Sequence, residues 1–563
     1  MHINFHTAHL RSVTKMVTFL RVLISLLCSI VLLALFKFFH KFWWVPMRIN
    51  RVMSSQGIRG PPYSFIYGNM KEISIMIKQS MSFPVDISHD IFPRIQPHFD
   101  SWLHIYGVLH VCFDTGKNFL YWQGPQPELV VTEPELLKQI MSVRELTTRI
   151  QGTGPAFKKI FGGGLIFSQG EKWATQRKLA THAFNGERLK VSSYKQFIRE
   201  LLWSHYRVKP PSHEHVLNMV PTMVESVDMM LKRWKDAGTK EKDVHEEFLT
   251  MTSEVISKIV FGSNYEEGKQ IFQKQGALIG LAAKQLSKVR LPGFGMMFKD
   301  KEDLETDKLL ASIQDIITKM IKNRENMMVS GDEHNSTTDY LGILLNSRHD
   351  VNDGYRLSIQ DIIDECRTFY IAGHGTISIL LTWATLLLGI HTEWQEKARE
   401  EVQQVFGNQN PSSEGIPRLK KMSMIINETL RLYPPGISTT RKVQKETHVG
   451  DLVLPPNLNL QIPALPFHQD RGTWGEDAHL FKPERFSEGV ANVVNSNPGA
   501  FLPFGYGPRI CVGNNFGINE SKITLSMILQ HYRFTLSPNY VHAPYQHITL
   551  RPKSGVQIIF QAL

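Results

Sequence analysis

The hydrophobic and polar positions divide the chain into a short apolar N-terminal segment and a long mixed body. Residues 16–36 are almost entirely apolar, with Arg21 as their one charged side chain. A helix of this length spans about 30 Å, the thickness of the hydrocarbon core of a bilayer. An aromatic cluster follows, as at membrane interfaces: Phe38, Phe39, Phe42, Trp43 and Trp44. We predict a transmembrane anchor over 16–40, after an N-terminal extension over 1–15 and before a basic, Pro- and Gly-containing hinge over 41–62.

A cleaved signal peptide is the alternative interpretation of the apolar segment. It requires small residues at a cleavage site after the apolar run, but the chain continues with FKFFHKFWW. Four basic residues follow the span and three precede or begin it, which weakly favours a cytosolic location for the C-terminal body. Met16 is an alternative start to Met1.

The body beyond residue 60 shows mostly helical periodicity with a few short strand-like runs. Its clearest helix is predicted from Ser358 to about Gly389, with Ser358 as N-cap and Asp361 three residues later. After Phe369 the pattern is apolar nearly all round, which indicates a buried helix. Small and polar residues interrupt it at 372–376, including two glycines that each cost about 1 kcal/mol relative to alanine. A large group pressing against the helix explains this interruption; close helix packing is the alternative.

Composition narrows the function classes. A hydrophobic content of 42% excludes wholesale disorder, and four cysteines in 563 residues do not form a disulfide scaffold. Beyond the anchor no apolar stretch is long enough to span a bilayer, which excludes a multi-span transporter. Eight of the eleven net positive charges lie in residues 1–60, so the charge flanks the anchor and does not indicate a nucleic-acid partner. We predict one large domain over 63–563, mainly α with small β-sheets.

Candidate chemistry lies near the C-terminus, around Cys511. Glycines and a proline before it predict a tight turn, and a helical pattern follows from Phe516. A thiolate at a helix N-terminus is stabilised by the helix dipole, and Arg509 adds a nearby cation. Gly513 lets a flat group approach. No further Cys or His stands at zinc spacing, whereas a single thiolate suits an iron held by a macrocycle.

This loop resembles that of the cytochrome P-450 superfamily, the haem-thiolate monooxygenases. The pattern F-x-x-G-x-R-x-C-x-G is met in full, and three further family motifs occur in order: W-x-x-x-R, E-x-x-R and P-E-R-F. The residues that carry the resemblance are Phe504, Gly507, Arg509, Cys511 and Gly513, with Trp173, Arg177, Glu428, Arg431 and 483–486. The resemblance covers roughly residues 60–563. The residues in and around these motifs are similar to those of the plant secologanin synthase-like group.

The resemblance implies a cytochrome P-450 fold and a membrane-bound enzyme that inserts one oxygen atom of O2 into a lipophilic small molecule. A plant specialised metabolite or hormone such as a terpenoid is the expected substrate. It further implies haem b and electrons from NADPH through a flavoprotein reductase. The expected location is the endoplasmic reticulum membrane, with a single span and the catalytic domain facing the cytosol.

The resemblance also implies roles for single residues. Cys511 is the axial ligand of the haem iron. Haem propionates are expected at Trp173, Arg177 and Arg509, with Arg441 as a weaker candidate. A buried structural ion triad is expected from Glu428, Arg431 and Arg485. Thr376 is the expected catalytic residue of the long helix.

The oxygen-activation stretch departs from the family pattern A-G-x-[D/E]-T. Gly375 stands where the family has an acid, and Ile377 replaces a small hydroxylic residue. His374 is a candidate substitute for the acid because its pKa is ordinarily near neutrality. The alternative, which we favour, is that His374 is a helix residue packed away from oxygen.

Two segments, 108–116 and 191–218, interrupt otherwise continuous family-like sequence. They are either lineage-specific loops or retained introns in the translated sequence, and we favour the second interpretation. Under this interpretation His213 and His215, which lie in the second segment, are not a metal-binding pair. The glycine run 162–164 is not a phosphate loop, since no Lys-Ser/Thr follows at the required spacing.

Two other functions stay open from the sequence. The missing acid fits a haem-thiolate isomerase or dehydratase that uses neither oxygen nor a reductase, whereas Thr376 and the complete Cys511 loop favour the monooxygenase. A non-catalytic haem-binding protein is the second alternative. Substrate contacts are expected in four largely apolar stretches: 150–164, 372–376, 436–440 and 542–547.

Overall fold

The computed structural model describes most of the chain. The described residues are 2–83, 85–106, 118–143, 161–184, 219–238, 240–262, 265–286, 300–329, 339–349, 355–494, 497 and 499–563. Both expected insertions, 108–116 and 191–218, lie outside them, as do Cys112, His213 and His215. The predicted class is confirmed: the body is mainly helical, and its strands form small sheets.

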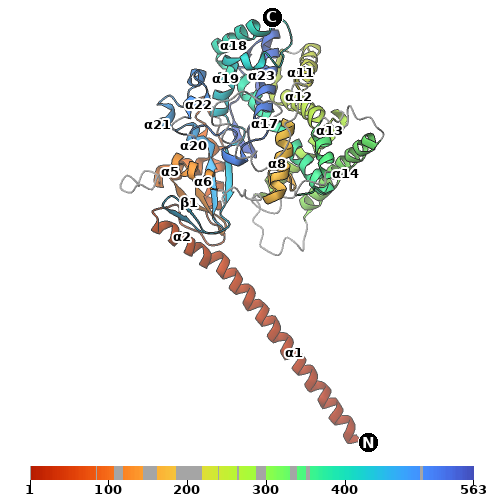
Figure 1. The fold of residues 1–563 in the computed structure, drawn as a ribbon. Coiled ribbons are helices and arrows are strands. Elements are labelled where there is room, and N and C mark those ends of the chain that lie inside the picture. Colours follow the sequence, from red (N-terminus) through yellow and green to blue (C-terminus); the bar gives the residue numbers. More distant parts are fainter. Residues whose placement is uncertain are drawn as a thin grey trace.

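A single long helix, α1 (His2–Phe39), projects from the body as a rod (Figure 1). Among the described residues two helical stretches are long and apolar enough to cross a membrane. One is Met16–Ser55, with mean hydropathy 2.7 and none of its apolar window buried. The other is α17 (Ile359–Ile390), so the expectation that no apolar stretch beyond the anchor is long enough to span a bilayer was wrong; 83% of its apolar window is buried inside the body, as in a core helix. The exposed stretch is therefore the one suited to a bilayer.

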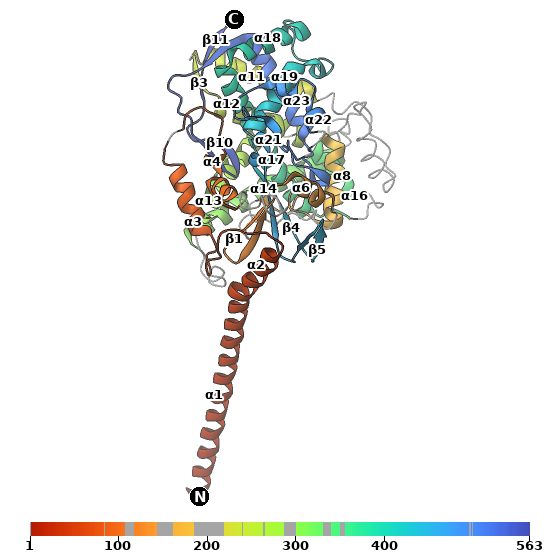
Figure 2. The same ribbon diagram turned by 90° about the vertical axis from the view of Figure 1, so that its left-hand side faces the viewer.

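The segment after α1 packs onto the body. A π-helical turn, η1 (His40–Trp44), leads into α2 (Val45–Ser55), which lies beneath the strands in Figure 2. Ile49 and Met53 of α2 are buried in a core shared with a four-stranded sheet. The Tyr63 hydroxyl donates to the Phe42 carbonyl at 2.6 Å. Part of the expected hinge 41–62 is thus held by the body.

The four-stranded sheet has the order β1-β2-β7-β4, with β2 and β7 parallel. Its strands are β1 (Phe119–Gln123), β2 (Gln126–Val130), β7 (Asn459–Pro463) and β4 (Ser438–Lys442). A three-stranded sheet joins β3 (Glu241–Asp243), β11 (Gln557–Ala562) and β8 (Tyr532–Leu536); hairpins join β9 (Pro544–His547) to β10 (Thr549–Pro552) and β5 (Thr447–Val449) to β6 (Leu452–Leu454).

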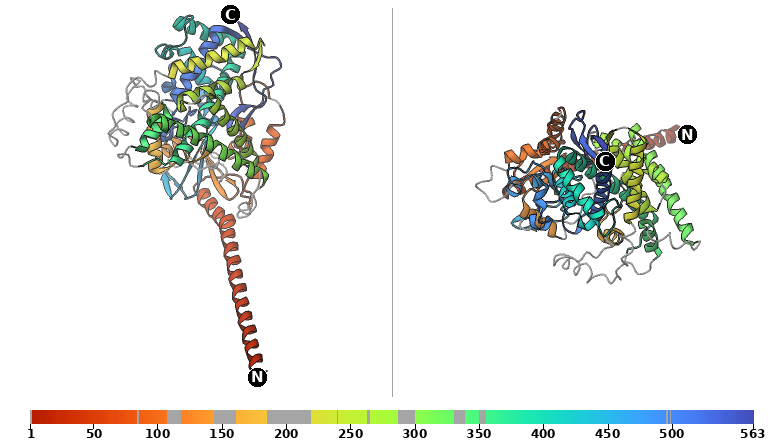
Figure 3. Two further views of the ribbon diagram at one scale, coloured as in Figure 1. Left: turned by 90° about the vertical axis from the view of Figure 1, so that its right-hand side faces the viewer. Right: turned by 90° about the horizontal axis from the view of Figure 1, so that it is seen from above.

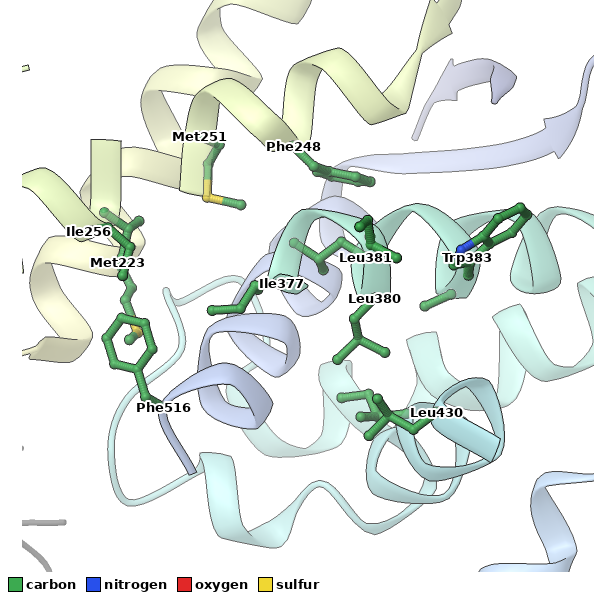
Figure 4. Packing of buried hydrophobic residues seen from close by; sticks show 14 of the residues in the cluster. Met223, Phe248, Met251, Ile256, Ile377, Leu380, Leu381, Trp383, Leu430 and Phe516 are labelled. Atoms are coloured by element: carbon green, nitrogen blue, oxygen red, sulfur yellow. The ribbon is translucent and has the colours of Figure 1, made fainter. Parts of the chain in front are cut away.

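The helices form the larger core around α17. The capping box predicted at its start is present: the Ser358 side chain accepts from Asp361 N, and the Asp361 side chain accepts from Ser358 N. Packed along or near it are α12 (Val244–Phe261), α18 (Thr392–Phe406), α19 (Lys420–Leu432) and α23 (Asn514–His531). Figure 4 shows Leu380 of α17 pointing toward Leu430 of α19.

The remaining elements cover this core. They are α3 (Met70–Ser80), α4 (Phe92–Ile95), α5 (Pro97–Tyr106), α6 (Pro134–Ser142), α8 (Gly170–Phe184), α11 (Met219–Asp236), α13 (Tyr265–Leu286), α14 (Lys301–Val329), α16 (Tyr340–His349), η4 (Ile416–Arg418), α20 (Ala464–His468), α21 (Arg471–Trp474), η5 (Pro483–Phe486), α22 (Val490–Val493) and η6 (Gly507–Arg509). The four-stranded sheet lies on the side where α2 joins the body, and α11–α14 lie on the other (Figures 1 and 3).

Candidate active site

The loop before α23 has the tight geometry that its glycines predict. Gly505 and Gly507 have φ angles of 75° and 77°, which side chains rarely allow. Cys511 N donates to the Phe504 carbonyl at 2.9 Å, which closes the loop. A Cβ atom on Gly507 would lie 3.1 Å from the Met141 carbonyl, so the loop also packs closely on α6. The Cys511 side chain is exposed, three residues before α23 begins.

Cys511 faces a cavity of about 420 Å³ between its loop and α17. The loop contributes Phe504, Cys511 and Gly513 to the wall, and α17 contributes Ala372 and Thr376. Most other lining side chains are apolar, among them Ile256, Ile377, Leu380, Leu430 and Phe516, which Figure 4 shows beside α17 and α23. Of the residues that interrupt α17, Ala372, Gly373 and Thr376 border the cavity, whereas Gly375 does not. A Cβ atom on Gly373 would clash with Ile256 Cδ1, so this glycine also allows close packing of α12, the alternative interpretation.

The wall fits a flat macrocycle with one thiolate ligand. Cβ atoms built on Gly436, Gly505 and Gly513 would meet no atom within 4 Å, so open space lies beside all three. Among the described residues no group of three or more His, Cys, Asp or Glu side chains could hold a bare metal ion. The residues present thus suit a haem iron ligated by Cys511.

Two guanidinium groups and an indole lie together on one part of the wall. The guanidinium carbon of Arg509 lies 4.2 Å from the Trp173 ring centroid, and Arg509 Nη2 donates to the Ser168 carbonyl at 3.0 Å. Arg177 Nη1 donates to the Ile510 carbonyl at 2.5 Å. All three predicted propionate contacts, Trp173, Arg177 and Arg509, line the cavity. Paired cations of this kind bind carboxylates well.

Arg441, the weaker candidate, lies behind this wall. It is 3% exposed, and its Nη1 donates to Thr439 Oγ1 and to the Thr440 carbonyl. Thr439 and Thr440 line the cavity, but the Arg441 side chain does not. These hydrogen bonds hold strand β4 in place, and they favour this structural role for Arg441 over contact with a bound group.

On α17, Thr376 and His374 lie on different faces. Thr376 lines the cavity, and its hydroxyl donates to the Ala372 carbonyl at 2.8 Å. The His374 ring is buried away from the lining: its Nδ1 donates to the Tyr370 carbonyl, and its ring packs on Phe272 at 4.4 Å. Burial lowers the pKa of His374 to about 4, so it is neutral at neutral pH. This geometry favours the alternative in which His374 packs away from oxygen.

A cation that the sequence pattern did not indicate approaches the place of the missing acid. A Cβ atom on Gly375 would lie 3.8 Å from Arg551 Nη2, and no other atom would lie within 4 Å. Arg551 belongs to β10, far along the chain, and its Nε donates to Thr549 Oγ1 at 3.1 Å. No local signal in the sequence relates positions 375 and 551, because the hairpin alone brings them together.

The three residues of the predicted ion triad lie together. Arg431 donates to both oxygens of Glu428 at 2.7 Å, and both side chains are fully buried. Arg485 Nε lies 3.6 Å from Glu428 Oε1. Arg485 also contacts Asp477 at 2.5 Å, so the network extends to a fourth residue that sequence reasoning missed. It joins α19 to η5, outside the cavity lining.

Comparison with known proteins settles the family. Residues 94–208 and 204–560 match the family model described as Cytochrome P-450. The chain belongs to the cytochrome P-450 family. The two matched pieces of this P-450 meet at 204–208, inside the second expected insertion.

Curated relatives extend over nearly the whole chain. It is 46% identical over 543 residues to the cytochrome P-450 CYP749A22 of Panax ginseng, covering 96% of this chain and 97% of the relative. It is 35% identical to secologanin synthase 1 of Catharanthus roseus over 92% of this chain and 94% of the relative. It is 34% identical to echinocystic acid 23-monooxygenase of Saponaria officinalis over 95% and 98%.

These matches confirm the expected family, its secologanin synthase-like resemblance and its class of activity. As a P-450, the chain is a monooxygenase that uses a haem-thiolate cofactor and O2, and draws electrons from a redox partner. The exposed apolar helix of this P-450 agrees with anchoring in a membrane.

Proposed function

We propose that this P-450 inserts one oxygen atom of O2 into a lipophilic plant metabolite, with Cys511 as the axial ligand of haem b. The observation that carries the proposal is the shared cavity: the Cys511 side chain and Thr376 line it from two separate elements, and the remaining wall is mostly apolar. An apolar pocket with few polar groups suits a lipophilic ligand.

The chain's own residues have separable roles in this reaction. Bound haem supplies the oxygen chemistry. Cys511 holds the iron and donates electron density to it. Trp173, Arg177 and Arg509 orient the propionates, and Thr376 holds a water molecule beside the oxygen site. Apolar side chains such as Leu380 and Phe516 exclude bulk water and orient the substrate.

The substrate class follows from the lining and from the relatives. Arg177 and Arg509 are engaged by the cofactor in this proposal, which leaves a wall of apolar and small side chains for the substrate. One relative is named as a monooxygenase of echinocystic acid and another as a secologanin synthase. We therefore propose a terpenoid, or a plant hormone of similar lipophilicity.

The proposed electron source is NADPH, through a flavoprotein reductase in the same membrane. The proposed location is the endoplasmic reticulum, with the body in the cytosol, as the basic residues after the span favour. The proposed division is an extension over 1–15, an anchor over 16–40, a basic hinge over 41–62 and a catalytic domain over 63–563. Burial of Ile49 and Met53 supports counting α2 with the body's fold.

The test is turnover of the full-length protein in membranes with the reductase, NADPH and isotope-labelled O2. A panel of terpenoids is supplied, and products are examined by mass spectrometry for one labelled oxygen atom. Product lacking the label and formed without NADPH would instead support an isomerase or dehydratase, which the missing acid at Gly375 favours. Haem binding with no product from any panel member would support the non-catalytic alternative.

A further inference from the structure

Three successive glycines, Gly162–Gly164, form a turn that lies against α17. Gly162 has a φ of 74°. A Cβ atom on Gly162 would lie 2.6 Å from Asp364 Oδ1, and one on Gly164 would lie 2.8 Å from Glu365 Oε2. Real Cβ atoms do not approach so closely. The glycines therefore let the turn reach the acidic side chains of α17 at a distance that no other residue type allows.

Glu365 is the buried centre of this contact. Its side chain is fully buried, and each carboxylate oxygen accepts one short hydrogen bond. Leu165 N donates to Oε2 at 2.7 Å, and the Tyr340 hydroxyl donates to Oε1 at 2.6 Å. One carboxylate thus joins three segments: the glycine turn, α17 and α16. Breaking such a buried pair of bonds leaves a costly unsatisfied group.

Both partners of Glu365 continue directly into the cavity wall. Leu165 and the next two residues, to Phe167, line the cavity. The Tyr340 ring packs on Phe369 at 4.6 Å and on Phe184 at 5.7 Å. Phe184 and Phe369 stack on each other at 5.2 Å and also line the cavity. Glu365 itself does not line it, so any effect on a ligand acts through these neighbours.

We propose that Glu365 is a positioning residue that fixes one wall of the substrate cavity, and so helps to determine which substrates fit. The carboxylate holds the backbone of the glycine turn on one side and the aromatic group around Tyr340 on the other. This inference rests on the proposed function only in identifying the cavity occupant as substrate.

Burial places the titration of Glu365 in the neutral range, and the groups around it modify the pKa. Tyr340 from α16, Lys172 from α8, and Asp364 and Cys366 on α17 itself face or neighbour it. Burial raises the pKa of Glu365 to about 7, against the lowering effect of the Tyr340 and Leu165 hydrogen bonds and of Lys172. Above about pH 7 the carboxylate accepts both hydrogen bonds. Below it, one oxygen carries a proton and can no longer accept its bond in the same way, so the hydrogen bonding to Leu165 and Tyr340 changes.

The test uses ligands that bind the haem iron of the full-length holoprotein and need no turnover. Two neutral triazoles are titrated optically, one unsubstituted and one with a bulky aryl group that reaches the wall. Glu365→Leu is expected to weaken the bulky ligand roughly tenfold, because the wall loses both bonds, and to change the small one by less than about twofold. Glu365→Gln keeps the shape but replaces one acceptor oxygen by an NH2 donor, as protonation does, so its affinity for the bulky triazole should match that of the unmodified protein below pH 7 and exceed that of the Leu variant.

The pH profile separates this role from a general structural one. The affinity of the unmodified protein for the bulky triazole should fall as pH drops through about 7, and the Gln variant should lack this dependence. Tyr340→Phe removes a donor to the carboxylate, so the midpoint should move to higher pH. Glu400→Gln, the same change at an exposed carboxylate of α18, is the matched control and should alter nothing.

Equal affinity of Glu365→Leu and the unmodified protein for the bulky ligand would overturn the inference. So would a pH dependence that persists in Glu365→Gln, or a midpoint that Tyr340→Phe leaves unmoved. Because iron ligation needs neither O2 nor a reductase, these results are independent of whether the chain oxidises a terpenoid. If the Leu variant does not retain haem, the Gln and Phe variants decide the question.

Discussion

Gly375 leaves an open space on α17 that the Arg551 guanidinium approaches to within 3.8 Å of a Cβ position. A glycine offers no proton and no hydrogen bond from its side chain, and general acid assistance typically contributes about 10²–10⁴-fold. Together with a neutral His374 turned from the cavity, this implies poor coupling in the unmodified chain. NADPH should be consumed with much peroxide and little product.

Gly375→Glu is expected to raise the product formed per NADPH consumed, provided that Thr376 is intact and a true substrate is bound. The new carboxyl group would lie close to the Arg551 guanidinium, which would orient it, and as a titratable group it could take up a proton from solvent and pass it on, which glycine cannot do. Gly375→Gln matches its size without the charge and should not improve coupling. Tight coupling in the unmodified protein would show that Gly375 is no defect and that an ordered water path delivers the protons.

At the scale of elements, the triad network joins α19 to η5. Glu428→Gln should lower the free energy of unfolding by roughly 3–5 kcal/mol, because it leaves the fully buried Arg431 guanidinium without its carboxylate and removes one partner of the partly buried Arg485. Denaturant unfolding of the holoprotein measures this. The control is Glu476→Gln, which breaks an exposed pair with Arg471 and should change stability by less than about 1 kcal/mol. Equal effects of both substitutions would contradict a structural role for the network.

Truncation of the anchor alone and truncation of the anchor together with α2 should have different effects. A variant that begins at residue 42 lacks α1, and should lose carbonate-resistant membrane attachment while keeping the haem spectrum. A variant that begins at Ile58 also loses Ile49 and Met53 from the second core, so it should be less stable by a few kcal/mol, about 2–5 for each large buried side chain.

Membrane fractionation and thermal unfolding of the two variants test this separation. Carbonate-resistant attachment of the shorter variants would contradict a single anchor. Equal stability of both variants would show that α2 does not contribute to the body's core.

At the scale of the whole molecule, histidines with a lowered pKa outnumber carboxyls with a raised pKa among the described residues. Burial lowers the pKa of seven histidines, six of them to about 3 or 4, and raises that of six carboxyls, three of them strongly. The histidines are His89, His98, His245, His374, His468 and His542, with a smaller shift at His547; the carboxyls are Glu128, Glu365 and Glu520, with smaller shifts at Asp100, Glu254 and Asp339. Below about pH 6.5 the unfolded chain binds protons at histidines that the folded chain keeps neutral, so acid destabilises the fold.

The glutamates act in the opposite direction. The stability that they contribute to the fold is present at low pH and is lost as pH rises from their pKa in the unfolded chain to their folded-state pKa of about 7. Since the histidines are more numerous, the net stability should fall as pH drops from about 7 to 5. Thermal unfolding across this range measures the slope. A midpoint that rises on acidification would contradict this balance.

Local motifs were predictable from sequence, whereas long-range contacts were predictable only where the family resemblance implied them, as for Arg485 with Glu428 and for Arg509 with Trp173. The Cys511 loop, the capping box at Ser358 and the apolar anchor each depend on residues close together in the chain. The approach of Arg551 to Gly375 and the hydrogen bond from Leu165 to Glu365 join segments that are 176 and 200 residues apart in the chain. The position of Arg441 behind the wall likewise follows from the register of β4 against β7, which composition does not encode.

The ferrous carbon monoxide spectrum tests the central claim most directly, because a thiolate ligand shifts the Soret band to the red. The unmodified protein and its Cys28→Ser and Cys366→Ser variants should all show the shifted band, since Cys28 lies in the anchor and Cys366 is buried in α17 away from the cavity. Cys511→Ala should lose it. A shifted band that survives in Cys511→Ala, or that disappears in Cys366→Ser, would contradict the assignment of Cys511 as the iron ligand.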